Sequence, residues 1–336
     1  MSFRGIFSYL RSHPVVCLFL LTPGIPEYLT GSSPLNAFAL NPLQFMFQLL
    51  LNAGLYLPGA LLIREATIRW KKGWASILLL GAAYGILEEG IALGTLYDPL
   101  AKPVGALGYY GHWLGVSWVW TAGILLVHMI YSIALPILLL NLALPRIRGR
   151  RLLSLRQVYM SLCVLGVDVM VLFALVSFSS HFWMGWPVFV GSWLAIAALV
   201  WAAHKASADL AGARSLLPKT GPRTAFLMGL IFFTSILFPE HLLMGAGVAP
   251  VAAIVVMYSL EGLLLAWILR NIGKAENERA TIALSFGMLV PIAVFGFLAE
   301  FNFPMILLAD LVMVLFFRML WRRHASRQKA GGLVMV

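Results

Sequence analysis

Charged residues are scarce in this sequence. They make up only 11% of its 336 residues, against roughly a quarter in a soluble domain. So few charges cannot cover a water-facing surface, which excludes soluble globular classes. Cysteine is nearly absent, and because Cys17 and Cys163 both lie in apolar runs, the sequence offers neither a disulfide framework nor a thiolate metal site. It also lacks an ATP-binding loop, a haem-attachment motif and a dinucleotide fingerprint.

Apolar residues dominate instead, at 61% of the chain, with a mean hydropathy of +0.90. In hydrocarbon every backbone polar group needs an internal partner, which leaves helices or a closed barrel. The apolar runs are close to the length of a membrane-spanning helix and do not alternate, so they predict an all-α, polytopic bundle of about ten transmembrane helices. The predicted segments are residues 14–30, 43–64, 74–96, 114–141, 157–178, 184–204, 225–244, 249–270, 280–299 and 302–321.

The first of these segments follows Arg4 and Arg11, as a secretory signal would, but Pro23, Pro26 and Glu27 interrupt it. We interpret it as a retained first helix that is broken or re-entrant at its prolines.

Basic residues occupy every second connection between the segments. Lys and Arg lie before segment one, after segments two, four, six and eight, and in the tail, whereas the other connections hold only Lys102. The positive-inside rule therefore predicts a plasma-membrane protein with both termini in the cytoplasm. The basic residues that give the net charge of +11 lie in the connections that set the orientation in the membrane. We therefore expect membrane lipids as partners and no nucleic acid. Residues 1–336 form one transmembrane domain in this interpretation, and residues 322–336 are a short basic cytoplasmic tail.

The longest external loop, about residues 97–113, is rich in tyrosine and tryptophan. An aromatic belt at the membrane surface explains these residues, and a lid over an external vestibule is the alternative.

Two adjacent carboxylates, Glu88 and Glu89, lie inside the third segment, where an ionised side chain costs ~2.5–3.5 kcal/mol. Both cannot ionise cheaply in a low dielectric, so at least one is expected to hold a proton. The fourth segment carries His128, Ser132 and Pro136 at spacings of four, on one helix face. Pro136 leaves the carbonyl of Ser132 without a donor. Since consecutive helices usually pack as neighbours, we predict that Glu88 or Glu89 lies close to His128.

Other ionisable residues within the segments have no basic partner there, so protons or a bound cation must balance them. The predicted proton or cation cavity comprises Glu88, Glu89, His128, Ser132, Asp168, Glu240, His241 and Glu261. Asp310 is a further membrane acid in segment ten. By contrast, we assign Glu27 to an external end that reaches water, and Glu65 to a surface pair with Arg69.

The two halves of the chain resemble each other faintly, in the same order and five segments apart. The matched features are Pro58 with Pro239, residues 88–90 with residues 261–262, and Pro136 with Pro291. An odd offset reverses orientation, so these matches predict a 5+5 inverted repeat with halves 1–180 and 181–325. Chance similarity between apolar helices is the alternative.

The order Glu88-Glu89 followed by His128 resembles the CPBP (Abi, Rce1-like) intramembrane metalloproteases over about residues 75–140. This resemblance implies a metallo-hydrolase, in which Glu88 or Glu89 activates water and His128 assists or binds a metal such as zinc. The sequence departs from the family pattern, because Leu93 stands four residues after Glu89 with no arginine following, and Ile124 stands where the family has phenylalanine. A second histidine motif is also missing.

Three classes of function therefore remain. A cation- or proton-coupled transporter uses buried acids and prolines that free backbone carbonyls, and it is the function we favour. The CPBP-like hydrolase is the alternative, with Glu88, Glu89 and His128 as its catalytic residues. In the third class, a structural subunit, the same polar groups only hold helices together. The sequence does not name a solute, a lipid or a peptide as substrate.

Overall fold

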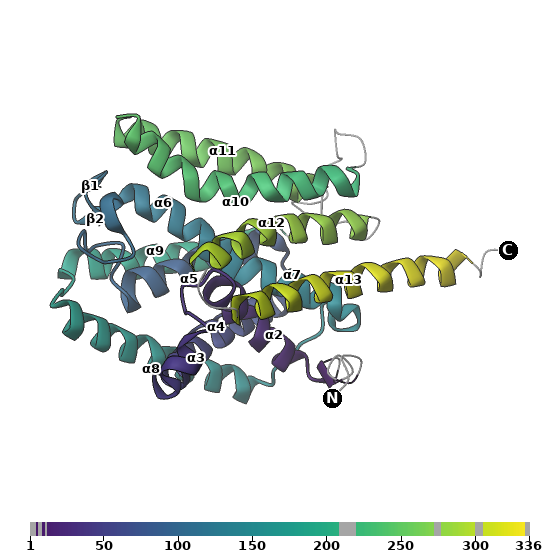
Figure 1. Cartoon of the computed structure of the whole chain (residues 1–336). Coiled ribbons are helices and arrows are strands. Elements are labelled where there is room, and N and C mark those ends of the chain that lie inside the picture. Colours follow the sequence, from purple (N-terminus) through teal and green to yellow (C-terminus); the bar gives the residue numbers. More distant parts are fainter. Residues whose placement is uncertain are drawn as a thin grey trace.

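The computed structural model describes residues 5, 9–10, 12–207, 220–271, 277–299 and 305–332 (Figure 1). Apart from one short hairpin, the regular elements of this part of the chain are helices, which confirms the all-α prediction. The N-terminal half contains α2 (Pro14–Pro23), η1 (Gly24–Tyr28), α3 (Ala37–Leu40), α4 (Pro42–Arg69), α5 (Trp74–Gly85), η2 (Ile86–Ala92), η3 (Gly105–Gly108), β1 (His112–Trp113), β2 (Val116–Ser117), α6 (Trp118–Val127), η4 (His128–Ala134), α7 (Leu135–Ala143) and η5 (Pro145–Ile147). The C-terminal half contains α8 (Leu155–Ser180), α9 (Trp186–Lys205), α10 (Pro222–Gly245), α11 (Pro250–Asn271), α12 (Glu278–Ala299) and α13 (Met305–Gly332).

Seven of the described helical stretches are long and apolar enough to cross a membrane. An eighth is added if α10 is a single span, which bends by 48° between Ile236 and Phe238. Pro239 explains the bend, because it cannot donate to the carbonyl of Ser235. The chain therefore has the helices of a multi-pass membrane protein.

Two of the ten predicted segments are not among these spans. The first is the short apolar helix α2 continued by the π-helical turns of η1, and the last starts outside the described residues and continues as α13. The helix count of ten, the orientation of the termini and the inverted repeat stay predictions.

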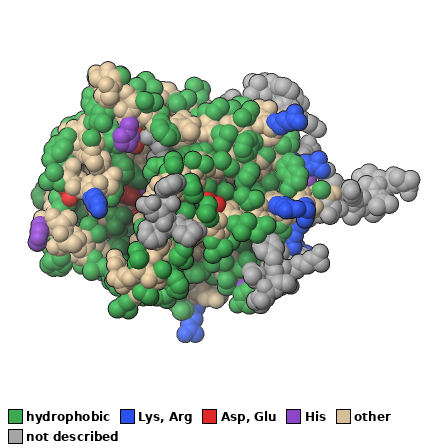
Figure 2. All heavy atoms as spheres, in the orientation of Figure 1, with side chains coloured by type: hydrophobic (Ala, Val, Ile, Leu, Met, Phe, Trp, Pro, Cys, Tyr) green, Lys and Arg blue, Asp and Glu red, His purple; other side chains and the backbone are tan. Residues whose placement is uncertain are grey.

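Large apolar side chains cover the outer faces of the long helices. Leu43 on α4, Trp186 on α9 and Leu263 on α11 are each more than 70% exposed, as lipid-facing residues are. On the face shown in Figure 2, most Lys and Arg side chains lie at one end of this largely apolar surface. We call this the basic end; the starts of α10 and α12 lie there, and the β1–β2 hairpin lies at the opposite end (Figure 1).

Helices α10 and α12 pack closely because glycines face each other's backbone. A Cβ built on Gly229 would lie 2.4 Å from the carbonyl oxygen of Leu284, and one on Gly287 would lie 2.1 Å from that of Phe226. Small residues at such contacts allow membrane helices to approach to backbone distance.

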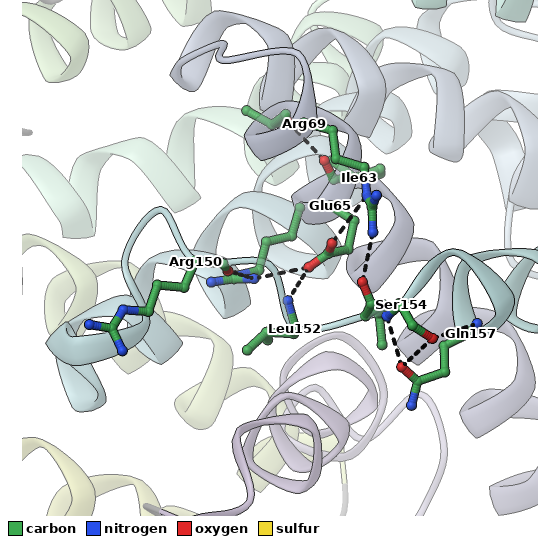
Figure 3. Close-up of polar contacts among 10 residues, drawn as sticks. Ile63, Glu65, Arg69, Arg150, Leu152, Ser154 and Gln157 are labelled. Atoms are coloured by element: carbon green, nitrogen blue, oxygen red, sulfur yellow. Dashed lines mark hydrogen bonds and ion pairs between the residues drawn. The ribbon is translucent and has the colours of Figure 1, made fainter.

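Glu65 pairs with Arg69 as predicted (Figure 3), but the prediction that this pair lies at the surface is wrong, because Glu65 is only 1% exposed. Its carboxylate accepts a hydrogen bond of 2.6 Å from the backbone N–H of Leu152, and it also pairs with Arg69 at 3.4 Å. Arg64 is buried as well, and it donates to the carbonyls of Ile147 and Arg150. These contacts fasten α4 to the connection that leads into α8, and we call them the α4–α8 clamp.

Candidate functional site

Three π-helical turns form the structural basis of the site. The backbone N–H of Leu29 bonds the carbonyl of Gly24 at the end of η1, Leu93 bonds Glu88 at the end of η2, and Leu135 bonds Ile130 at the end of η4, each five residues apart. Such turns are rare and are frequent at functional sites. In η4 the following Pro136 supplies a physical reason, because it has no N–H to continue the α-helical pattern.

Each of these turns carries polar groups of the site. Glu27 lies in η1, Glu88 and Glu89 lie in η2, and His128 and Ser132 lie in η4. Gly85 allows η4 to approach α5, since a Cβ there would lie 3.2 Å from the Cβ of His128.

The sequence predicted Glu88 or Glu89 close to His128, and in the structure His128 stands between the two. Its Nε2 lies 2.8 Å from Oε1 of Glu89, and its Nδ1 lies 2.9 Å from Oε2 of Glu88. The Nδ1 also lies 3.1 Å from the Ser132 hydroxyl and forms its hydrogen bond there. Oε2 of Glu88 has no hydrogen bond, so its contact with Nδ1 is one between charges. All three ionisable side chains are buried, with exposures of 1%, 7% and 4% for Glu88, Glu89 and His128.

The chain that follows η2 reaches into the site through Thr95. Gly94, at a φ of +68°, turns the chain after η2, and the Thr95 hydroxyl then donates to the second carboxylate oxygen of Glu89. Trp120 contacts the same hydroxyl through its indole N–H at 3.4 Å. Glu89 is thus held between a histidine and a threonine, and sequence reasoning did not identify Thr95.

The loop at about residues 97–113 is folded, and some of its tyrosines contact other helices and loops whereas another is exposed. The Tyr97 hydroxyl contacts Ser192 of α9, and the Tyr110 hydroxyl donates to the carbonyl of Val248 at 2.7 Å. Tyr109 is exposed, at 65%. The loop is therefore tied to α9 and to the segment that leads into α11, and the aromatic belt and the lid both stay predictions.

Glu27 was predicted to reach water; it is half-buried and is held by hydrogen bonds. Its carboxylate accepts hydrogen bonds from Tyr56 at 2.5 Å and from Ser33 at 2.7 Å, and it lies within electrostatic range of Glu88 and His128. Gln48 and Asn52 of α4 donate in turn to the Ser33 hydroxyl. Glu27 is therefore a second polar centre beside the first, connected to α4 by a chain of hydrogen bonds.

Asp168 borders this region from α8. Its carboxylate packs against Gly54 of α4, where a Cβ would lie 2.5 Å from Oδ1, and it is within electrostatic range of Glu88. One of its oxygens has no hydrogen-bond partner.

The remaining predicted residues lie on another side of α6 and η4. Glu240 of α10 packs on Gly123, and its neighbour His241 is 61% exposed, with Nδ1 3.7 Å from the Glu240 carboxylate. Glu261 of α11 is buried near Tyr131 and beside Ser235, although neither of its oxygens has a partner with hydrogen-bond geometry. The predicted single cavity of eight residues is therefore divided into separate polar centres.

The described residues do not fit the metal that the CPBP resemblance implies. Across the described part of the chain, no three His, Cys, Asp or Glu side chains converge as ligands of one ion. His128 also turns both ring nitrogens to glutamates, so a metal would have to displace at least one of these contacts.

No protein-family model, curated protein or solved structure matches this chain. Its function must therefore be argued from the site.

An apolar groove of about 640 Å³ adjoins the site between α4, α5, α8 and α9. Tyr84, Leu87 and Ile91 line it from α5 and η2, the elements that carry the glutamates. The Tyr84 ring lies 6.4 Å from the His128 ring, centroid to centroid, and so separates the groove from the polar interior.

Proposed function

We propose that this protein is a multi-pass membrane carrier whose transport is coupled to a proton or cation bound at Glu88, Glu89 and His128. The observation that carries the proposal is that each ring nitrogen of one buried histidine faces a different buried carboxylate.

Charge balance explains why this arrangement favours coupling. With an imidazolium and two carboxylates the group carries one net negative charge, and no described Lys or Arg contacts it. An uncompensated charge is costly in a buried site, so one more proton or a cation makes the group neutral. A bound proton that can leave only when the site opens is what coupled transport requires.

The position of the site supports the same function. The loop around Thr95 covers one side, and the irregular turns of η1, η2 and η4 surround the centre. Membrane carriers place irregular backbone where it surrounds a binding site near the middle of the membrane.

Proteoliposomes with a pH-sensitive dye in the lumen test this function. A panel of amino acids, sugars and organic cations is applied as a gradient, and we expect at least one solute to drive a luminal pH change with wild-type protein. Glu89→Gln and His128→Asn should abolish the change, because each removes a titrating group from the site. Asp310→Asn is the matched control, since Asp310 lies on α13 and belongs to none of these contacts.

Two outcomes would contradict coupling at this site. One is a pH change that Glu89→Gln leaves intact, and the other is uptake of a solute without any movement of protons or of a cation in the buffer.

A hydrolase is the second candidate, favoured by the apolar groove that adjoins the elements carrying a carboxylate–imidazole pair. An apolar substrate in the groove would lie against Tyr84, on whose other side Glu89 and His128 form an acid–base couple. Metal analysis of the purified protein separates the two functions. Stoichiometric zinc in wild type that is lost in Glu89→Gln supports hydrolysis, whereas proton-linked uptake by metal-free protein supports the carrier.

A further inference from the structure

A second groove, of about 660 Å³, lies between α10, α12 and α13, away from the glutamates. Its floor is aromatic: the rings of Phe226 and Phe286 lie 5.8 Å apart and those of Phe286 and Phe317 lie 5.0 Å apart, measured between centroids. One phenylalanine comes from each helix, so the floor exists only where the three helices meet.

Arginines line the basic end of this groove. Arg223, in the first turn of α10, and Arg318 of α13 are both exposed lining residues, and neither has an ion-pair partner among the described residues. A third guanidinium, that of Arg279, lies 6.0 Å above the ring of Trp321, which also lines the groove. The acidic residue at this rim, Glu278, already pairs with His324 at 3.4 Å and Arg148 at 3.9 Å.

The order of these residues matches the depth profile of a bilayer leaflet. Tryptophan and arginine are typical of the headgroup level, and Arg318 and Trp321 lie further along α13, which runs toward the basic end (Figure 1). Val314, Phe317 and the other phenylalanines lie further from that end, in the apolar part of the helices. A molecule that fits both parts has an anionic head and an apolar tail.

We propose that this groove binds an anionic phospholipid, with its phosphate at Arg223 and Arg318 and an acyl chain on the phenylalanine floor. A free phosphate would leave the apolar floor without a contact. A zwitterionic lipid brings its own cation to an arginine rim, so it binds there more weakly. The proposal is independent of the function of the Glu88–His128–Glu89 site.

Lipid binding is measured by native mass spectrometry of the full-length protein in detergent, with phosphatidylglycerol, phosphatidylcholine and inorganic phosphate titrated separately. We expect phosphatidylglycerol to bind in preference to phosphatidylcholine, and inorganic phosphate not to compete. Arg223→Gln combined with Arg318→Gln should weaken phosphatidylglycerol binding by roughly 30-fold, since each arginine near an anionic lipid contributes about fivefold. The matched control is Arg151→Gln combined with Arg156→Gln, two exposed arginines outside the groove.

Equal binding of the two lipids, or a groove variant that binds phosphatidylglycerol like the control variant, would overturn the proposal. If the groove variant does not fold, the wild-type protein still decides. Its preference for phosphatidylglycerol should then fall as salt screens the arginines, and a preference that is constant with salt would contradict a site built on charge.

Discussion

His128 is the residue on which the interior depends most, because three polar side chains from two helices meet on its ring. The spacing of polar residues and the neighbour rule for consecutive helices were sufficient to predict a contact with Glu88 or Glu89, but not with both. They could not predict Thr95 or Glu27, because a turn at a positive-φ glycine brings Thr95 back to the site, and Glu27 is bound by Tyr56 from another helix.

A neutral amide at position 89 preserves the shape of the carboxyl group. Glu89→Gln should therefore insert and fold like wild type, whereas Glu89→Ala should lose roughly 1–3 kcal/mol of stability, because the donors of Thr95 and His128 lose their acceptor. Thermal unfolding in detergent measures the difference. If the two variants are equally stable, the carboxylate is not an essential acceptor for these donors.

Glu65 provides a prediction about the α4–α8 clamp. Glu65→Gln should destabilise the protein by about 3 kcal/mol, because it breaks a buried ion pair and leaves Arg64 with only carbonyl partners. Denaturant unfolding compares it with Arg151→Gln, an exposed change at the same end. Similar stability of the two variants would show that Glu65 is dispensable for the clamp.

At the scale of elements, the apolar runs predicted most of the long helices but not how they pack. Glycine spacing alone does not distinguish Gly287, which presses on the backbone of α10, from Gly166, which has open space around it. The π-helical turns could not be predicted from the sequence either, because hydrogen bonds between residues five apart depend on tertiary contacts as well as on Pro136.

Close packing of α10 and α12 yields a prediction for Gly287. Gly287→Ala should lower the melting temperature and the yield of folded protein, since its Cβ would lie 2.1 Å from the carbonyl oxygen of Phe226 and the helices would have to separate. Gly166→Ala on α8 should be neutral or slightly stabilising, because alanine favours a helix. Equal melting temperatures for the two variants would mean that α10 and α12 adjust without cost.

At the scale of the whole molecule, the distribution of charge predicts a topology that the fold alone does not test. Reporters fused after Arg151, after Arg214 and at the C-terminus should report cytoplasm, and one near Lys102 should report the external side. Residue 214 lies outside the described residues, so that position rests on sequence alone. Reversal of any two reporters would contradict both the orientation and the count of ten helices.

The α4–α8 clamp also determines how these two helices can separate. At the basic end, parting them would break several buried hydrogen bonds, and an unpaired buried group costs roughly 1–3 kcal/mol each. Further along, Asp168 of α8 packs on Gly54 of α4, and Oδ2 of Asp168 has no hydrogen-bond partner. We therefore expect the clamp to act as a pivot if the helices part, with the separation growing toward the end of α4 and α8 farthest from the clamp. Because the groove beside Tyr84 lies between these helices, it would widen from that end, and an apolar molecule from the surrounding lipid would enter it there first.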